Sequence, residues 1–414
     1  MRALISVTDK TGIEELAKGL KDLGIEIVST GGTYKKIKDA GVDAIEIDQI
    51  TNFPEILEGR VKTLSPYVHG GILYKRDEKS HVDTINDLDI KPIDLVVVNL
   101  YQFQKALEKG NPDDIIENID IGGPSMVRSA AKNHKDVLIV TDPADYDELL
   151  ERLKNNEVDI EYRQRLAMKA YSLTAFYDSV IARYFQDLTG KDSKYKTYGF
   201  EKESDLRYGE NPGQAAALYN DPFVKGLMDD MEVIHGKEMS YNNYNDLNPA
   251  LELAQELGEN AVVALKHQSP CGVAQKNSVY ESYIKAFECD SQSIFGGIVA
   301  VNGVVDGKTA SKMHEIFLEI IAAREFTDEA LEILQQKKNV RLVRVNFDNE
   351  TVREEIRYLN GKVLIQDKDF GEDEVEVVTD EKPSESQIKD LLFAQKVVKY
   401  VKSNAIVVAK ICKP

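Results

Sequence analysis

A lysine and a histidine stand side by side in "VVALKHQSPCG" (262–272), where four apolar residues give way to a turn. Histidine exchanges a proton near neutral pH, and a neighbouring ammonium group can stabilise negative charge that develops during a reaction. Adjacent strand residues point to opposite faces, so Lys266 and His267 can share a pocket only if the chain leaves the strand at His267. Pro270 biases Ser269 toward extended or turn geometry, which favours such an exit.

Cys271 leaves a second chemistry open, because it follows His267 by four residues. In this alternative the thiol is the nucleophile and the histidine is its base. No third residue that would orient the histidine is visible in the sequence, and small buried cysteines are common in protein cores. We therefore favour chemistry at the lysine–histidine pair.

Two turns near the start of the chain combine glycine, hydroxyl and lysine side chains. "SVTDKTG" (6–12) places Ser6, Thr8 and Lys10 after an apolar run, and "STGGT" (29–33) follows the next run. Backbone N–H groups at a strand-to-helix turn can bind a phosphate, helped by the helix dipole. A tight turn that uses glycine for backbone freedom is the alternative. If both turns end strands of one parallel sheet, they converge on one crevice, which favours an anion site.

"GRVKTLSP" (59–66) adds two basic residues, Arg60 and Lys62, with Thr63 beside them. The segment is too short and broken to be a plain helix face. A solvated basic pair is the alternative for a surface loop. For this segment taken alone the solvated pair would be favoured, although any local basic cluster is informative on a chain this acidic.

"IDIGGPSMVRSAAKNHKD" (119–136) predicts a helix, because Pro124 suits a first helical turn. Arg128 and Lys132 then lie on one helix face, where like charges repel. We expect this pair to face inward, toward an anionic ligand or toward Asp120 as its carboxylate partner.

The composition excludes several classes of protein. Lys+Arg 52 and Asp+Glu 71 give 52 − 71 = −19, a surface that repels nucleic acid and anionic membranes. Cys271, Cys289 and Cys412 form no CxxC pair and are odd in number, which indicates a reducing compartment and argues against disulfides or a structural zinc site. No apolar run is long enough to span a bilayer, so we expect a cytoplasmic protein.

These residues need an α/β scaffold, and 414 residues suggest two or three domains. The hydrophobic pattern predicts a helix with Leu16, Leu20 and Leu23 on one stripe over 12–24, and a polar linker over 189–204. The other predicted elements are strands at 3–8, 25–30, 94–101, 137–142, 261–267 and 296–303, and helices at 160–188 and 247–258.

The motifs resemble a known family. "SVTDKTG", "STGGT", "GRVKTL", "NLYQF" and "IDIGGPSMVRSAAKNH" occur in this order in bifunctional purine-biosynthesis proteins that combine phosphoribosylaminoimidazolecarboxamide formyltransferase and IMP cyclohydrolase activities. "LRYGENPGQ", "SYNNYNDLN", "LKHQSPCG" and "SNAIV" match the formyltransferase half. The resemblance implies an α/β fold: a parallel-sheet domain similar to methylglyoxal synthase over 1–150, connecting helices and a linker over 151–204, and an α/β formyltransferase region over 205–414 that is incomplete at its C-terminus.

The resemblance implies that the first domain closes the purine ring, as a carboxamide nitrogen attacks a neighbouring formyl carbon and water leaves. Lys62 would stabilise the formyl oxygen, and Lys132 would donate and accept protons. Tyr101 and Asp120 would orient the amide. The implied substrate-binding residues of this domain are Ser6, Thr8, Asp9, Lys10, Ser29, Thr30, Gly31, Gly32, Thr33, Arg60, Thr63 and Asn99.

For the second half, the resemblance implies that His267 takes a proton from the aromatic amine as it attacks the formyl group of 10-formyltetrahydrofolate. Lys266 would favour this proton movement. The implied substrate-binding residues are Arg207, Tyr208, Gly296 and Asn404.

The resemblance also implies 10-formyltetrahydrofolate as co-substrate, no metal, and a homodimer. The alternative function is a nucleotide-sensing domain without turnover, since related folds also bind effectors. Lys62, Tyr101, Asp120 and Lys132 argue against it, because a sensor needs only the phosphate loops.

Beyond "SNAIV" the family's pattern continues with a GxGAGQ-type loop, an "SDAFFPF"-like segment and a "QPGGS"-like segment, none of which occurs in this chain. In the family these segments complete the pocket around the lysine–histidine pair. "NAIVVA" (404–409) is predicted to be a buried strand. We therefore expect a truncated chain that closes the purine ring, transfers formyl groups very poorly and tends to aggregate through its second half.

Overall fold

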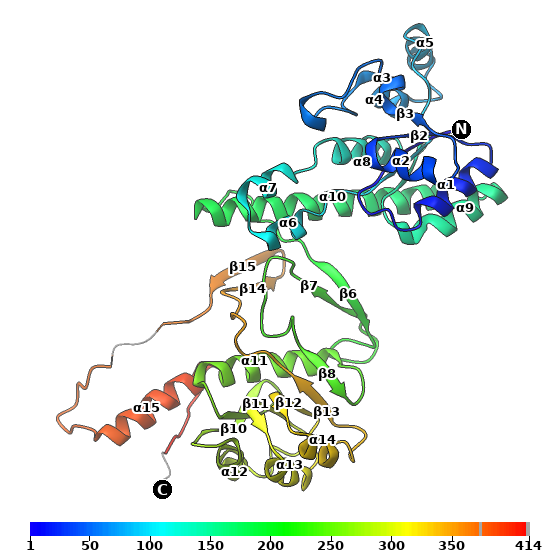
Figure 1. The fold of residues 1–414 in the computed structure, drawn as a ribbon. Coiled ribbons are helices and arrows are strands. Elements are labelled where there is room, and N and C mark those ends of the chain that lie inside the picture. The colour runs from blue at the N-terminus through cyan, green and yellow to red at the C-terminus, as the bar shows by residue number, and fades with distance from the viewer. Residues whose placement is uncertain (372–374, 411–414) are drawn as a thin grey trace. The chain divides into compact units, whose positions relative to one another are not determined.

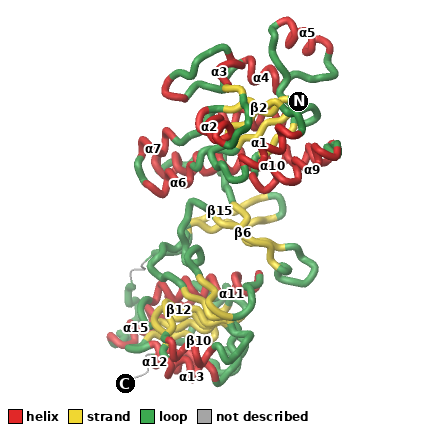
Figure 2. The backbone as a smooth tube through the Cα atoms, turned by 45° about the vertical axis from the view of Figure 1, so that its right-hand side comes forward, coloured by secondary structure: helices red, strands yellow, loops and turns green. Residues whose placement is uncertain are grey.

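The computed structural model describes residues 1–371 and 375–410, which divide into two compact units, Met1–Phe200 and Glu201–Pro414 (Figure 1). Each unit is built on a sheet of its own (Figure 2). The division lies within the predicted linker 189–204. The end of that segment is not loop, because residues 201–206 pair as a strand.

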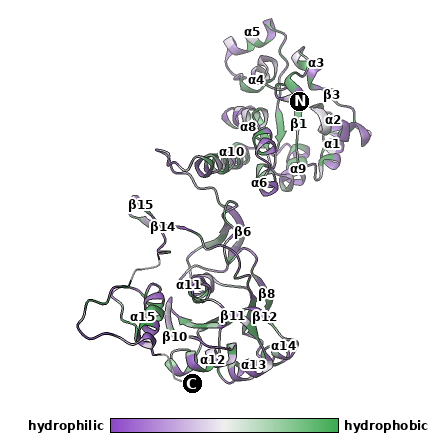
Figure 3. Cartoon of the chain, turned by 60° about the vertical axis from the view of Figure 1, so that its left-hand side comes forward, coloured by the Kyte–Doolittle hydropathy of each residue, from purple (hydrophilic) through white to green (hydrophobic). Residues whose placement is uncertain are grey.

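The sheet of the first unit is parallel throughout and has the order β3-β2-β1-β4-β5. The central strands are apolar runs buried on both faces, as parallel sheets covered by helices require (Figure 3). All five carboxyl ends therefore meet at one edge. The strands are β1 (Arg2–Ser6), β2 (Glu26–Ser29), β3 (Ile45–Glu46), β4 (Leu95–Val98) and β5 (Leu138–Val140).

The helices of this unit cover the sheet with apolar stripes. In α1 the predicted stripe is confirmed for Leu16 and Leu20, which are fully buried, while Leu23 is the half-buried C-cap. The helices are α1 (Ile13–Asp22), α2 (Gly31–Asp39), α3 (Ile47–Thr51), α4 (Pro66–Leu73), α5 (Lys79–Asp87), α6 (Phe103–Lys109), α7 (Pro112–Glu117), α8 (Gly122–Lys132), α9 (Tyr146–Asn155) and α10 (Ile160–Thr189), with short 3₁₀ turns at Leu57–Gly59 and Pro143–Asp145.

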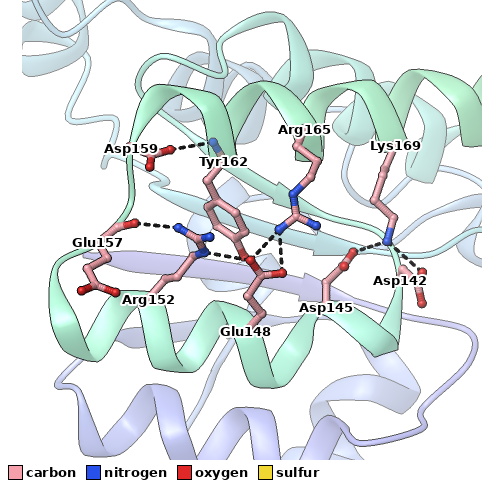
Figure 4. Close-up of polar contacts among 9 residues, drawn as sticks. All are labelled: Asp142, Asp145, Glu148, Arg152, Glu157, Asp159, Tyr162, Arg165 and Lys169. Carbon is pink, nitrogen blue, oxygen red and sulfur yellow. Dashed lines mark hydrogen bonds and ion pairs between the residues drawn. The ribbon is translucent and has the colours of Figure 1, made fainter.

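Helix α10 belongs to this first unit, where it packs on α8 and β5. Charged side chains join it to α9 and to the turn before α9 (Figure 4). The Glu148 carboxylate accepts from Arg152 Nε at 2.8 Å and from Arg165 at 2.6 Å, and Lys169 pairs with the buried Asp145 at 2.6 Å. The long helix is thus fixed to its unit by ion pairs as well as by apolar packing.

The second unit contains a mixed sheet with the order β10-β9-β11-β12-β13-β8. One apolar core lies between this sheet and helices α12 to α14, and another between the sheet and α11. The strands of the sheet are β8 (Glu232–His235), β9 (Ala261–Lys266), β10 (Ser269–Gln275), β11 (Ile298–Val305), β12 (Ile320–Phe326) and β13 (Arg341–Arg344).

Helices and two hairpins complete the second unit. The hairpins are β6 (Glu201–Leu206) with β7 (Ala216–Asn220), and β14 (Glu354–Leu359) with β15 (Lys362–Asp367). The helices are α11 (Tyr241–Leu257), α12 (Val279–Cys289), α13 (Gly307–His314), α14 (Asp328–Leu334) and α15 (Glu385–Val398).

Two sequence predictions in this unit differ from the structure. Helix α11 starts six residues before the predicted 247, because Ser240 and Asn243 form a capping box. The predicted strand at 404–409 is wrong: these residues pair with no strand, and Ile406 and Val408 are 90% and 93% exposed. A strand needs a neighbour for its backbone groups, and an apolar pattern alone does not supply one.

Within the described ranges, no helix is long and apolar enough to cross a membrane. The same residues contain no group of three or more His, Cys, Asp and Glu side chains that could hold a metal ion. Cys271 and Cys289 are free thiols, and Cys412 lies outside the described residues.

The ion pairs of α9 and α10 predict a pH-dependent contribution to stability. Hydrogen bonds from Arg165 and Arg152 lower the pKa of Glu148 in the folded chain. A lowered carboxyl pKa contributes stability above the ordinary value, and the contribution is lost as the pH falls through the lowered one. Because Glu148 is 36% exposed and screened by solvent, Glu148→Gln should cost at most about 1 kcal/mol of unfolding free energy at pH 7.

Urea denaturation at pH 7 and at pH 3 would measure this cost, which should shrink toward zero at the lower pH. Glu151→Gln removes an exposed carboxylate from the same helix and is the matched control. An equal loss in both variants, or a loss for Glu148→Gln that persists unchanged at pH 3, would contradict a contribution from these pairs.

Candidate active sites

A cavity of about 690 Å³ opens in the first unit at the carboxyl ends of β1, β2 and β4. This is the edge where an open α/β sheet binds ligands, at the point where the strand order reverses. Of the residues predicted from the sequence, the cavity is lined by Ser6, Thr8, Lys10, Thr30, Gly31, Gly32, Thr33, Arg60, Lys62, Thr63, Asn99, Tyr101 and Asp120.

The two predicted phosphate turns are held against each other and against β4. The Asn99 side-chain oxygen accepts from the backbone N–H groups of Thr8, at 2.6 Å, and Asp9, at 3.0 Å. The Thr33 hydroxyl accepts from the Val7 N–H at 3.1 Å and donates to the Val7 carbonyl at 2.9 Å. The loop after β1 is therefore fixed by side chains from the two neighbouring strand ends.

Three cationic side chains reach the cavity: Lys10, Arg60 and Lys62. Gly31 has a φ of 42°, and a Cβ there would lie 3.2 Å from Lys62 Nζ, so glycine lets the amine approach the loop backbone. Lys62 is paired with Glu55 and Arg60 with Glu117, and both carboxylates line the cavity. An anionic ligand must therefore displace carboxylates from these two cations.

Asp120 is the most buried acid of the cavity. Burial raises the pKa of its carboxyl group, and hydrogen bonds from the backbone N–H groups of Gly123, at 2.8 Å, and Tyr101 partly oppose that rise. Burial, with the nearby charge of Asp120, also raises the pKa of the Tyr101 hydroxyl. The cavity thus holds a carboxyl group with a raised pKa beside a tyrosine hydroxyl that remains a hydrogen-bond donor.

Arg128 and Lys132 do not face the cavity, and the prediction that they point inward is wrong. Both side chains are exposed, and Arg128 lies over the Tyr171 ring, 5.4 Å from its centre. Helix α8 reaches the cavity with its first turns, up to Met126. At 100° per residue, Lys132 points well away from that face, and it lies roughly 9 Å further along the helix than Met126.

Two predicted phosphate-loop residues also lie outside the cavity lining. The Ser29 side chain is fully buried and donates to the Ile5 carbonyl at 2.8 Å, so it joins β2 to β1. The Asp9 carboxylate accepts from the backbone N–H and the hydroxyl of Thr11, at 3.0 and 2.7 Å. Both residues shape the loops rather than line the cavity.

In the second unit, Lys266 ends β9 and His267 leaves the strand, as the sequence predicts. His267 and Gln268 have φ values of 52° and 59° and form a two-residue turn, after which Ser269 pairs with Lys266. The Lys266 amine donates to the Phe295 carbonyl at 2.9 Å, next to the predicted Gly296. The structure therefore brings Lys266 and the Phe295–Gly296 segment to one edge of the sheet.

Other predicted residues of this unit lie elsewhere. Arg207 donates to the Tyr208 hydroxyl at 3.0 Å, and the loop that follows them docks on the start of α11, where the Asn242 amide donates to the Glu210 carbonyl at 3.2 Å. Asn404 is exposed, in a segment that is neither helix nor strand.

Cys271 is not suited to nucleophilic chemistry. The side chain packs against the apolar core beside α12, and its thiol donates to the Ala264 carbonyl at 3.5 Å. Burial raises the pKa of this thiol to about 11, so the reactive thiolate is scarce at neutral pH. The structure thus favours the lysine–histidine alternative.

Sequence reasoning missed Glu55, Glu117 and Asp246. The first two are the partners of the cavity cations, and Asp246 accepts the Gln268 N–H at 3.0 Å. Isolated carboxylates carry little signal in a chain with 71 acidic residues.

The sequence is similar to that of known proteins along nearly all of its length. Residues 130–413 match the family described as AICARFT/IMPCHase bienzyme, and residues 12–125 match the MGS-like domain. The chain is 50% identical over 416 residues to the bifunctional purine biosynthesis protein PurH of Clostridioides difficile (strain 630), which covers 99% of this chain and 82% of that protein. It is 51% identical over 420 residues to the protein of the same name from Bacillus cereus (strain Q1), with the same coverage.

A solved structure described as "Crystal structure of ForH" is 40% identical in sequence, covers 45% of this chain and 98% of that chain, and has a TM-score of 0.41. Two family matches and relatives of this identity confirm the resemblance seen in the motifs. The chain belongs to the AICARFT/IMPCHase bienzyme family.

Proposed function

We propose that the first unit closes the purine ring of IMP at its 690 Å³ cavity and that the second unit transfers the formyl group at the Lys266–His267 turn. The bifunctional family catalyses these last two steps of IMP synthesis. The observation that carries the assignment is the convergence of two phosphate-type loops with Lys62, Tyr101 and Asp120 on one cavity.

In ring closure a carboxamide nitrogen bonds to the formyl carbon, the carbon–oxygen bond breaks, and one water leaves. The loop after β2 binds the ribose phosphate through backbone N–H groups at Gly31 and Gly32, and the loop after β1 adds the Thr8 and Lys10 side chains. Lys62 stabilises the negative charge that develops on the formyl oxygen. Tyr101 and Asp120 orient the amide, and the raised pKa of Asp120 makes its carboxylate a stronger proton acceptor than an exposed one.

The proton-transfer role of Lys132 stays a prediction from the resemblance, because its amine lies outside the cavity lining of the chain. Asp9 and Ser29 support the loops and are proposed as binding residues only through that support.

In formyl transfer the exocyclic amine of the carboxamide nucleotide bonds to the formyl carbon, and the bond from that carbon to the folate nitrogen breaks. His267 accepts the proton that the amine loses, the folate nitrogen takes up a proton as it leaves, and Lys266 stabilises the charge on the formyl oxygen. Arg207, Tyr208, Gly296 and Asn404 are the proposed nucleotide contacts, on the strength of their motifs.

We extend the proposal to the surroundings of the enzyme. The formyl donor is 10-formyltetrahydrofolate, no metal takes part, the protein is cytoplasmic, and it works as a homodimer. The family supports these statements, and the net charge of −19 supports small-molecule substrates over nucleic acid or membrane.

Lys62→Ala should lower the rate of ring closure by about 10²–10³-fold, because it removes a charge aimed at the developing oxyanion. The assay follows conversion of the formylated nucleotide to IMP. Lys135→Ala is the matched control, since Lys135 is exposed and lies outside the cavity lining. Lys132→Ala tests the proton-transfer role that the resemblance implies, which predicts a loss of ring closure. Unchanged turnover in Lys62→Ala would overturn the assignment, and a loss in Lys132→Ala would show that Lys132 also reaches the substrate.

Glu55→Gln should tighten IMP binding about fivefold, equivalent to about 1 kcal/mol, because it frees Lys62 from its carboxylate partner. Calorimetric titration with IMP at low salt measures the change. Glu58→Gln removes a carboxylate from the same cavity without freeing Lys62. Equal tightening in both variants would mean that the net charge, and not the ion pair, limits binding.

His267→Ala should remove the formyl transfer that the unsubstituted chain supports, by about 10²–10⁴-fold, without slowing ring closure. Both half-reactions are assayed on the same preparation, with 10-formyltetrahydrofolate and the carboxamide nucleotide for the first. Cys271→Ala tests the cysteine alternative and should keep the activity. Formyl transfer that survives in His267→Ala but not in Cys271→Ala would reverse the assignment.

A further inference from the structure

The turn that carries His267 has a backbone conformation its residues do not favour. His267 and Gln268 have φ values of 52° and 59°. Hairpin turns with two positive φ values are usually filled by Asn-Gly, Asp-Gly or Gly-Gly, because a side chain crowds the backbone in the left-handed region. Such a conformation persists when the surrounding structure imposes it.

A single carboxylate meets the backbone of this turn. The Gln268 N–H donates to Asp246 Oδ1 at 3.0 Å, and the His267 backbone also acts on this carboxylate by lowering its pKa. Cross-strand pairing in the hairpin begins with Lys266 and Ser269, outside the turn. Asp246 therefore satisfies the Gln268 N–H, a donor inside the turn that the strand pairing does not use.

Asp246 is rigidly placed. It lies one turn after the capping box of α11, and the Asn243 amide of that box also donates to Glu319 Oε1 at 2.9 Å. The next residue, Leu247, is fully buried in the core between α11 and the sheet. Burial raises the pKa of Asp246, and the N–H groups of Gln268 and His267 oppose that rise. The helix thus presents a half-buried carboxylate that accepts a hydrogen bond from the turn.

We propose that Asp246 is a positioning residue for formyl transfer, whose carboxylate holds the His267–Gln268 turn in the left-handed conformation that sets the direction of the His267 imidazole. The inference rests on the proposed role of His267. In this proposal Asp246 does not contact the substrate. Without its carboxylate the turn relaxes and the His267 imidazole is misplaced. The loss should therefore lower the rate of the chemical step more than it weakens nucleotide binding.

Asp246→Ala should lower kcat of formyl transfer by about 10–100-fold with little change in KM for the carboxamide nucleotide. Asp246→Asn keeps one acceptor oxygen, so its kcat should lie between that of the unsubstituted chain and that of Asp246→Ala. The decisive variant is Asp246→Ala with Gln268→Gly, because glycine adopts positive φ without support. This double variant should regain most of the lost kcat, whereas a helix or core damaged at Asp246 would not be repaired by a glycine in the turn.

Amide hydrogen exchange gives a second readout that needs no turnover. In Asp246→Ala the His267 and Gln268 amides should exchange at least about tenfold faster, while the β9 amides of 262–265 stay protected and so report an intact fold. Unchanged exchange at the turn, or fast exchange with undiminished kcat, would overturn the inference. Formyl transfer that survives His267→Ala would instead refute the proposed function, so the two failures are distinguishable.

Discussion

The parallel pairing of β1 with β2 and β4 is the constraint on which the first site depends. It brings the loops after three strands to one edge, although they lie about 25 and 90 residues apart in the sequence. Hydrogen bonds from Asn99 and Thr33 then lock the loop after β1 into a fixed shape. These bonds already use the N–H groups of Val7, Thr8 and Asp9, so this loop offers a ligand mainly its Thr8 and Lys10 side chains.

The second unit positions its chemistry in another way. There a two-residue turn, and not a long loop, carries the histidine at the end of a buried antiparallel pair. The turn is held from outside by helix α11, where the Asp246 carboxylate accepts the Gln268 N–H. The first site is therefore a preformed cavity, whereas the second depends on how one strand end is held.

Much of this could be predicted from the sequence where the signal is local. Glycine and hydroxyl residues after apolar runs mark the loops, and Pro270 marks the exit of His267 from its strand. The orientation of α8 was also encoded, because Met126, Val127, Ala130 and Ala131 form its buried stripe and exclude Arg128 and Lys132. The sequence could not indicate Glu55, Glu117 or Asp246, since their roles follow from tertiary contacts with residues 7 to 57 positions away.

The Tyr177 hydroxyl on α10 accepts from the Asp120 N–H at 2.7 Å and donates to the Asn118 carbonyl at 3.0 Å. The Asp120 backbone is thus held by helix α10, which lies after the MGS-like match at residues 12–125. The smallest piece of chain able to keep this pocket in shape is therefore longer than the conserved module. If this domain were exchanged between relatives at residue 125, where the MGS-like match ends, it would lose the Tyr177 hydroxyl that holds the Asp120 backbone.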